Sequence, residues 1–211
     1  MEKSDEESTT DRLVLVNWFG IAGGVLMLAL PFLGAWWTAA AGDGVITVSF
    51  SPFFYRFTVI GETLTSTLVN YMILAAKLTV LVGGVFLILG SVFSFKWWGR
   101  KLVRWGCLKV MWMAVLLVVS LFLGSLLFNR FLDSILANFT GGEVPLEFSL
   151  PYLIGKGQAI ADVQQGITLK APIQMRFTPA FIIAILTAAL GIGAKIYNSK
   201  VKSKARNPEE S

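Results

Sequence analysis

The sequence predicts a membrane all-α bundle of four transmembrane helices with a small extracytoplasmic antiparallel β domain formed by the two outer loops. Three observations predict this fold class. Hydrophobic residues make up 55% of the 211 residues, only 15% are charged, and the hydrophobic residues gather in four long runs. A soluble domain has about 25% charged residues, and a membrane-spanning helix needs roughly 20 apolar residues. The length of the runs therefore indicates lipid, rather than a protein core, as their surroundings.

The runs divide the chain into helices, outer loops and cytoplasmic segments. The alternative for the first run is a cleaved signal peptide. A signal peptide has a basic start and a short apolar stretch, whereas the first run is long and begins after acidic residues. We expect a disordered cytoplasmic N-terminus at 1–12, transmembrane helices at 13–41, 66–95, 105–129 and 178–197, outer β loops at 42–65 and 130–177, a basic cytoplasmic loop at 96–104 and a disordered basic cytoplasmic tail at 198–211.

Lysine and arginine residues predict the orientation. They cluster in the loop at 96–104, with Lys109 just after it, and from Lys195 to Arg206 at the end of the fourth run. Basic residues beside membrane helices stay on the cytoplasmic side, whereas acidic residues have little influence. The sequence therefore predicts a multi-pass protein of the cell (plasma) membrane with both termini in the cytoplasm.

Side-chain alternation predicts β-strands in both outer loops. In the first loop, β-branched and aromatic residues at 45–50 and 53–60 flank a short turn, which predicts a hairpin. In the second loop, alternation is strongest at 167–177 and weaker at 144–150 and 158–163. A lone hairpin is marginal in water. We therefore expect one joint antiparallel sheet, with two flexible loops as the alternative.

Pro172 interrupts the best of these strands. Proline has no N–H to donate to a neighbouring strand, so it is found mainly on edge strands or at breaks. The strand at 167–177 is therefore expected to be an edge strand or to be broken at Pro172.

The composition excludes much catalytic chemistry. Histidine is absent and Cys107 is the single cysteine, so His-ligated metal sites, iron–sulfur clusters and Ser–His or Cys–His pairs are impossible within the chain. We expect no enzyme activity, cofactor or metal, and Cys107 to be either acylated or a buried inert thiol. The remaining enzymatic alternative is a Ser–Lys or carboxylate pair in the outer loops, drawing on Lys156, Lys170, Glu143, Glu147 or Asp162.

Lys77 is the most unusual residue of the apolar runs. A lysine at the centre of a membrane helix costs about 2.5–3.5 kcal/mol on insertion scales. Asn70, Lys77, Gly84 and Ser91 recur every seven residues and so share a helix face. This face is a possible intramembrane polar site; the alternative is that Lys77 extends its amine to the outer interface.

Small residues four positions apart predict close helix packing. Such pairs form either the internal bundle or an oligomer interface, and they are Gly20 with Gly24, Ala184 with Ala188, and Ala189 with Gly193. We also expect Ser120 and Gly124 to pack within the bundle. Asn138 begins an Asn-Phe-Thr sequence, which is either an N-glycosylation site in the outer loop or a chance match.

The predicted topology is similar to that of claudin-like and tetraspanin-like proteins, which also have four helices and ordered outer loops. The tryptophan and paired cysteines of the claudin loop and the cysteine-rich loop of tetraspanins are missing. The resemblance is therefore one of architecture alone and identifies no residues.

The expected function is that of a non-enzymatic interaction protein. Its outer β domain would serve as the contact surface of an accessory subunit in a membrane complex or of a cell-surface contact protein. The alternative is a transport or channel component that uses the stripe around Lys77. Expected partners are membrane lipids and other membrane or surface proteins, or a second copy of the chain. Nucleic acid is not expected, because the basic residues flank the apolar runs.

Overall fold

The computed structural model describes residues 16–94, 96–140, 146–149, 151–163 and 167–206, so the predicted disorder at 1–12 lies outside the described residues. The chain forms two compact units. The helical unit comprises Met1–Leu33, Ala75–Met113 and Ile182–Ser211, and the sheet unit comprises Gly34–Leu74 and Ala114–Phe181.

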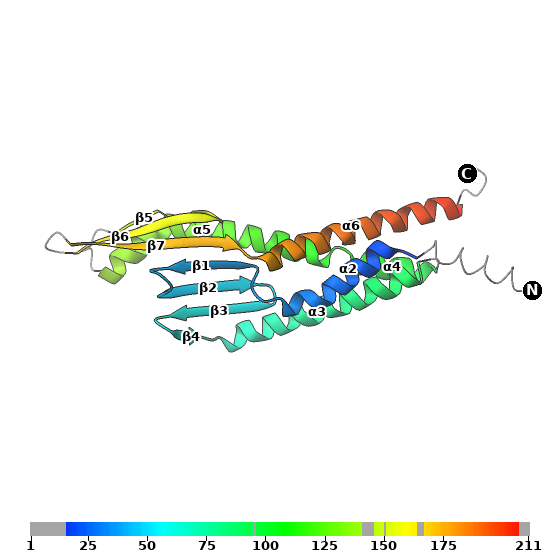
Figure 1. Ribbon diagram of the computed structural model, residues 1–211, viewed down its shortest axis with the longest axis horizontal. Coiled ribbons are helices and arrows are strands. Elements are labelled where there is room, and N and C mark those ends of the chain that lie inside the picture. The colour runs from blue at the N-terminus through cyan, green and yellow to red at the C-terminus, as the bar shows by residue number, and fades with distance from the viewer. Residues whose placement is uncertain (1–15, 95, 141–145, 150, 164–166, 207–211) are drawn as a thin grey trace, which may run out of the picture. The chain divides into compact units, whose positions relative to one another are not determined.

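Among the described residues, three segments are helical, long and apolar enough to cross a membrane, judged by length and composition: Thr67–Val92, Trp97–Leu127 and Pro179–Lys200. A shorter apolar helix covers Trp18–Phe32, about 22 Å at roughly 1.5 Å per residue. The helices labelled in Figure 1 are α2 (Trp18–Ala29), the 3-10 turn η1 (Leu30–Phe32), α3 (Thr67–Val92), α4 (Trp97–Gly106), α5 (Lys109–Thr140) and α6 (Pro179–Arg206).

The prediction of one helix over 13–41 is wrong after Phe32. Pro31 lies in the closing 3-10 turn, and Gly34 has a φ of +82°, in the left-handed region that favours glycine. The next residues, Trp37–Ala41, form strand β1. A run of tryptophan and alanine has the same hydropathy in a membrane helix as in a buried strand, so composition did not separate the two.

The predicted cytoplasmic loop at 96–104 is also mostly helical. Helices α3 and α4 form a tight antiparallel pair, because glycines bring their backbones into contact. A Cβ built on Gly106 would lie 2.6 Å from the carbonyl oxygen of Gly83, and one on Gly90 would lie 2.6 Å from that of Gly99. The connection between the two helices is therefore shorter than the predicted loop, because α3 ends at Val92 and α4 begins at Trp97.

Two further helices run past their predicted ends. Helix α5 continues through 130–140, which the sequence placed in the second outer loop, and α6 continues through Arg206, so the expectation of disorder from 198 onward is wrong as far as that residue. Polar residues do not break a helix, so a fall in hydropathy marks the end of an apolar run and not the end of the helix.

The sheet unit contains a seven-stranded antiparallel sheet with the order β4-β3-β2-β1-β7-β6-β5 (Figure 1). Strand β1, which lies in the segment predicted as helix, pairs with β2 of the first predicted loop and with β7 of the second. The strands of both loops therefore belong to one antiparallel sheet, as predicted, although the strand that joins them was not predicted. The strands are β1 (Trp37–Ala41), β2 (Ile46–Ser51), β3 (Phe54–Val59), β4 (Glu62–Leu64), β5 (Leu146–Ser149), β6 (Gly155–Val163) and β7 (Ile167–Phe177).

Strand β7 is central, so the prediction of an edge strand or a break at Pro172 is wrong. Strand β1 pairs with β7 only as far as Ala41 opposite Ile173, and the Gly42 N–H then donates to the Pro172 carbonyl at 3.0 Å. The N–H and C=O of one residue in an antiparallel strand point to the same neighbour. The N–H that Pro172 lacks would therefore have pointed toward β1, at a position where the pairing of β1 with β7 has already ended. On the other side of β7, pairing with β6 continues, with Gln158 opposite Pro172.

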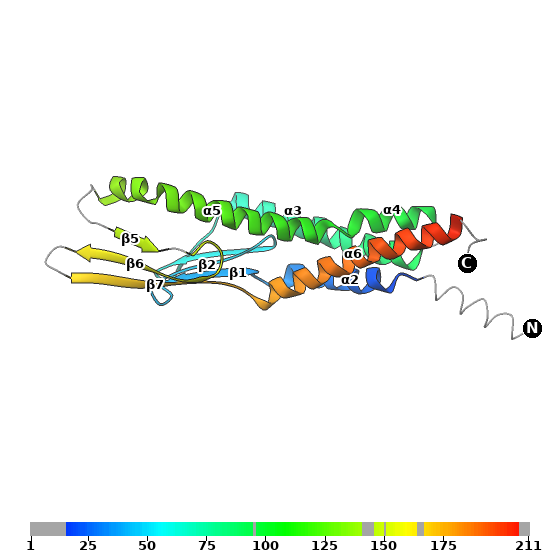
Figure 2. The ribbon, with the colours of Figure 1, turned by 90° about the horizontal axis from the view of Figure 1, so that it is seen from above.

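The register gives the sheet two different faces. Trp37, Ala39 and Ala41 alternate with Thr38 and Ala40 along β1, and the paired residues of β2 and β7 follow the same alternation. One face is therefore apolar and the other carries mainly hydroxyl, amide and basic side chains. Figure 2 shows α5 running along one side of this sheet.

Candidate functional site

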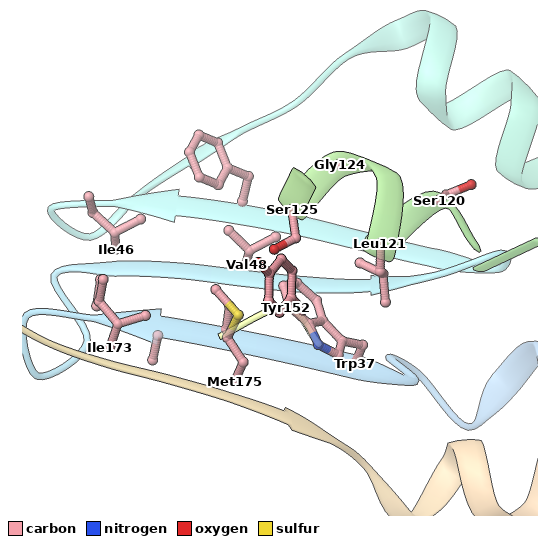
Figure 3. Close-up of a pocket in the computed structure, with 14 residues that line it drawn as sticks. Trp37, Ile46, Val48, Ser120, Leu121, Gly124, Ser125, Tyr152, Ile173 and Met175 are labelled. Carbon is pink, nitrogen blue, oxygen red and sulfur yellow. The ribbon is translucent and has the colours of Figure 1, made fainter. Parts of the chain in front are cut away.

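A cavity of about 560 Å³ lies between the apolar face of the sheet and α5 (Figure 3). All of its lining residues belong to the sheet unit. They are Trp37, Ala39, Ala40, Ala41, Ile46, Val48, Phe57, Ser120, Leu121, Gly124, Ser125, Tyr152, Ile173 and Met175. None of them is charged, and only two serines, one tyrosine and one tryptophan carry side-chain polar atoms.

Small residues at the centre of the sheet create the floor of this cavity. Ala39 pairs with Val48 on one side and Met175 on the other, and Ala41 pairs with Ile46 and Ile173. Strand β1 thus places two methyl groups between two rows of larger apolar side chains. The result is a trough along β1.

The opposite wall is the small-residue side of α5. Ser120 and Gly124 lie four residues apart and so share a helix face, with Leu121 and Ser125 beside them. A Cβ built on Gly124 would meet no atom within 4 Å. The expectation that Gly124 packs against another helix is therefore wrong, because this glycine faces open space in the cavity.

A short segment before β6 connects the two walls. The Nε1–H of Trp37 donates to the Leu153 carbonyl at 2.9 Å, and the Ser125 hydroxyl donates to the Pro151 carbonyl at 3.5 Å. The rings of Phe122 and Tyr152 lie 6.0 Å apart. This segment holds α5 to the sheet at one end of the cavity.

The lining of the cavity limits what can occupy it. The cavity is open along part of its surface, and several lining residues, including Gly124 and Tyr152, are exposed. Water is a poor filler, because a buried water needs two to four polar partners and the lining offers few. The space is therefore suited to an apolar occupant.

Among the side chains that the structure describes, the charged ones of the other face are all basic, and the register also aligns Glu147 and Asp162 with this face. A cross-strand row of this face joins Arg56, Ser49, Thr38 and Arg176 through three successive strand pairs. Strands lie about 4.8 Å apart, so the two arginine Cα atoms are separated by roughly 14 Å. Four cations of this face are exposed: Arg56, Lys156, Lys170 and Arg176.

The predicted polar stripe of α3 does not form one continuous surface. Asn70 is exposed and Lys77 is half-buried, whereas Gly84 and Ser91 are buried. A Cβ on Gly84 would lie 2.9 Å from a methyl of Leu28, and one on Gly20 would overlap the Ser91 hydroxyl. Gly84 and Ser91 therefore belong to the contact between α2 and α3.

The predicted packing residues are divided between buried and exposed positions. Gly20, Gly24, Ala184 and Ala188 are buried, Gly193 lies beside Phe19, and Ala189 is exposed. Gly24 meets Gly84 of α3, since a Cβ on Gly24 would lie 3.0 Å from the Gly84 carbonyl oxygen.

The remaining predicted residues lie in α5, at the end of α4 and in the second predicted loop. Asn138 lies within α5, and its side chain is outside the description. Cys107 is buried between α4 and α5, with its thiol 3.6 Å from the Arg104 carbonyl. Lys156 and Lys170 are exposed, whereas the side chains of Glu143, Glu147 and Asp162 are outside the description.

Sequence reasoning missed most of the cavity. Trp37, Ala39 and Ala41 fell within the expected helix, and no pattern linked them to α5. The available signal was the run of small residues at 120, 124 and 125 near the end of an apolar segment. Within the described part of the chain, no group of three or more His, Cys, Asp or Glu residues is suited to hold a metal ion.

Comparison with known protein families found no match for the chain, and comparison with curated proteins found none either. The fold and composition define a class: a protein with three long helices suited to a membrane and an antiparallel sheet unit. Any more specific function must be argued from the residues of the two sheet faces.

Proposed function

We propose that the protein is a multi-pass protein of the cell membrane, with four crossings and both termini in the cytoplasm. Three long apolar helices and the basic residues at 96–104 and after Ile196 support this topology. Trp18–Phe32 would be the remaining crossing. Its length of about 22 Å is less than the roughly 30 Å hydrocarbon core, so it requires local thinning of the bilayer or the residues before it.

In this topology the sheet unit lies outside the cytoplasm and acts without catalysis as an interaction module. The protein would be an accessory subunit of a membrane complex or a cell-surface contact protein. The observation that carries this proposal is the row from Arg56 through Ser49 and Thr38 to Arg176 on the sheet face opposite the cavity. Short hydroxyl side chains between two exposed arginines form an open basic surface.

The chemistry of this surface favours an acidic partner. Arginine presents a planar group that binds carboxylates through paired hydrogen bonds, and arginine is enriched in protein interfaces. The partner surface should carry carboxylates spaced to match arginines about 14 Å apart. A second copy of this chain would place like charges together and is disfavoured at this face.

The test is a charge-neutralising double variant, Arg56→Gln with Arg176→Gln, in the full-length protein. The matched control is Arg104→Gln with Lys200→Gln, which removes the same charge from two exposed positions of the helical unit. The size of the assembly is measured after gentle detergent extraction, at low and high salt. The wild type and control should form a salt-sensitive assembly that the sheet variant loses, because screening weakens exposed charge pairs.

A photo-crosslinking amino acid in place of Ser49 adds a direct measurement. It should give a discrete adduct with an acidic protein in intact membranes. A monomeric wild type, or a sheet variant that assembles as the control does, would refute an interaction role for this face.

The second candidate function is a transport or channel component. The observation in its favour is Lys77, a half-buried charge within the apolar helix α3. Substituting Lys77 by leucine should abolish transport in reconstituted vesicles and leave assembly through the sheet unchanged. Loss of assembly in the arginine variant together with unchanged flux in Lys77→Leu would select the interaction role.

A further inference from the structure

We infer that the cavity between α5 and the sheet is a binding site for one hydrocarbon chain of a membrane lipid. The inference rests on the proposed membrane location and is independent of the proposed protein partner. It assigns a ligand to the apolar face of the sheet, whereas the proposed interaction uses the basic face.

The lining selects an uncharged, apolar ligand. None of the lining residues carries a charge, so a phosphate, carboxylate or amine inside the cavity would lose its hydration without a compensating ion pair. The Nε1–H of Trp37 already donates to Leu153, and the Ser125 hydroxyl donates to Pro151. The tryptophan and this serine therefore offer a ligand little further polar recognition.

The size of the cavity is sufficient for one hydrocarbon chain. Small-molecule sites range from about 300 to 1,000 Å³, and this cavity of about 560 Å³ lies within that range. The trough follows β1, with Ala39 and Ala41 as its floor and larger apolar side chains on both sides. An apolar trough of this volume can accommodate a flexible alkyl or isoprenoid chain.

The position of the cavity on α5 indicates the source of the chain. Ser120, Leu121, Gly124 and Ser125 belong to the apolar segment Trp97–Leu127, which is suited by composition to a bilayer. Outward neighbours on the same turns, including Leu123 and Leu126, are large and exposed. Lipid chains that contact α5 therefore need only move around the helix to reach its small-residue side, while the head group remains outside the apolar lining.

Gly124 provides the variant that tests the inference. Because a Cβ at this position meets no atom within 4 Å, a large side chain can enter the cavity without displacing protein atoms close to the glycine. Gly124→Trp should therefore fill the ligand space. Leu123→Trp is the matched control, since it places the same indole on the neighbouring exposed position of α5.

The experiment uses the full-length protein in vesicles that contain a phospholipid with a photoactivatable group in one acyl chain. Labelled peptides are identified by mass spectrometry. In the wild type and Leu123→Trp, labels should include Leu121 on α5 and Met175 on β7. Labelling at both cavity positions should fall about tenfold or more in Gly124→Trp, as expected when the indole occupies the space of the chain.

Several outcomes would overturn the inference. One is wild-type labelling confined to outward residues of α5 such as Leu116 and Leu123; this result needs no variant and so does not depend on the folding of Gly124→Trp. Others are cavity labelling by a water-soluble photoactivatable fatty acid but not by the bilayer lipid, or crosslinking of Met175 to another protein. Failure of the protein to float with vesicles would refute the proposed membrane location instead, which separates the two failures.

Discussion

The side-chain amide of Asn17 donates a hydrogen bond of 2.8 Å to the carbonyl oxygen of Ala194, 177 residues further along the chain. Asn17 is fully buried, and its Oδ1 accepts from the Gly20 N–H at 3.2 Å as the N-cap of α2. Its own N–H donates to the Ser91 carbonyl at 3.1 Å. One residue therefore connects α2, α3 and α6 within the helical unit.

Replacing Asn17 by alanine should lower the free energy of unfolding by about 2–4 kcal/mol. The loss is the sum of the missing N-cap of α2 and the buried Ala194 carbonyl left without a donor. Asn17→Asp keeps the cap acceptor but cannot donate to Ala194, and should be at least as destabilising. Asn70→Ala, at an exposed position of α3, is the control. Denaturation in detergent micelles measures all three, and a neutral Asn17→Asp would show that the bond to Ala194 contributes nothing.

Glycines in the two units should respond oppositely to alanine. Gly106→Ala would force a Cβ to 2.6 Å from the Gly83 carbonyl oxygen and should cost about 1–3 kcal/mol through overpacking of α3 against α4. Gly124→Ala adds a Cβ in open space and should stabilise the helix by up to about 1 kcal/mol. Thermal unfolding of both variants in one detergent gives the comparison. A stabilised Gly106→Ala would contradict the packing assigned to α4, and a destabilised Gly124→Ala would contradict the open space beside Gly124.

Trp36 should be the most sensitive aromatic residue of the sheet unit. It is fully buried, and its ring lies 5.5 Å from Phe53 at 82° and 6.0 Å from Phe181. Trp36→Ala should cost about 3–5 kcal/mol through the cavity that it leaves. Trp36→Phe should cost much less, since the buried Nε1–H of Trp36 has no acceptor among the described residues. Trp18→Ala, at an exposed position, should be mild, and equal losses in Trp18→Ala and Trp36→Ala would refute a core role for Trp36.

Cysteine labelling should reveal the sidedness of the two units. In a Cys107→Ala background, Glu62→Cys on β4 should react with a membrane-impermeant maleimide in intact cells. Lys101→Cys on α4 should react only after permeabilisation, because the basic cluster is proposed to face the cytoplasm. Both positions are exposed, so access and not burial decides the result. The reverse pattern would invert the proposed orientation.

The sequence by itself determined the features that depend on local composition and periodicity. Long apolar runs predicted the helices suited to a membrane. Runs of β-branched and aromatic residues predicted strands at 45–50 and 53–60, and period-two alternation predicted the strand at 167–177. Cysteine and histidine content limited the possible chemistry. These features follow from each segment alone, because hydropathy and alternation are properties of neighbouring residues.

Only the tertiary structure decided the features that depend on which segments meet. Trp37–Ala41 becomes a strand because it pairs with both β2 and β7, although its apolar composition fits a membrane helix equally well. Pro172 is tolerated in a central strand because β1 ends beside it. The cavity arises because alanines of β1 lie opposite Gly124 of α5. These small residues are about 80 positions apart in the sequence, so no local pattern predicts that they face each other.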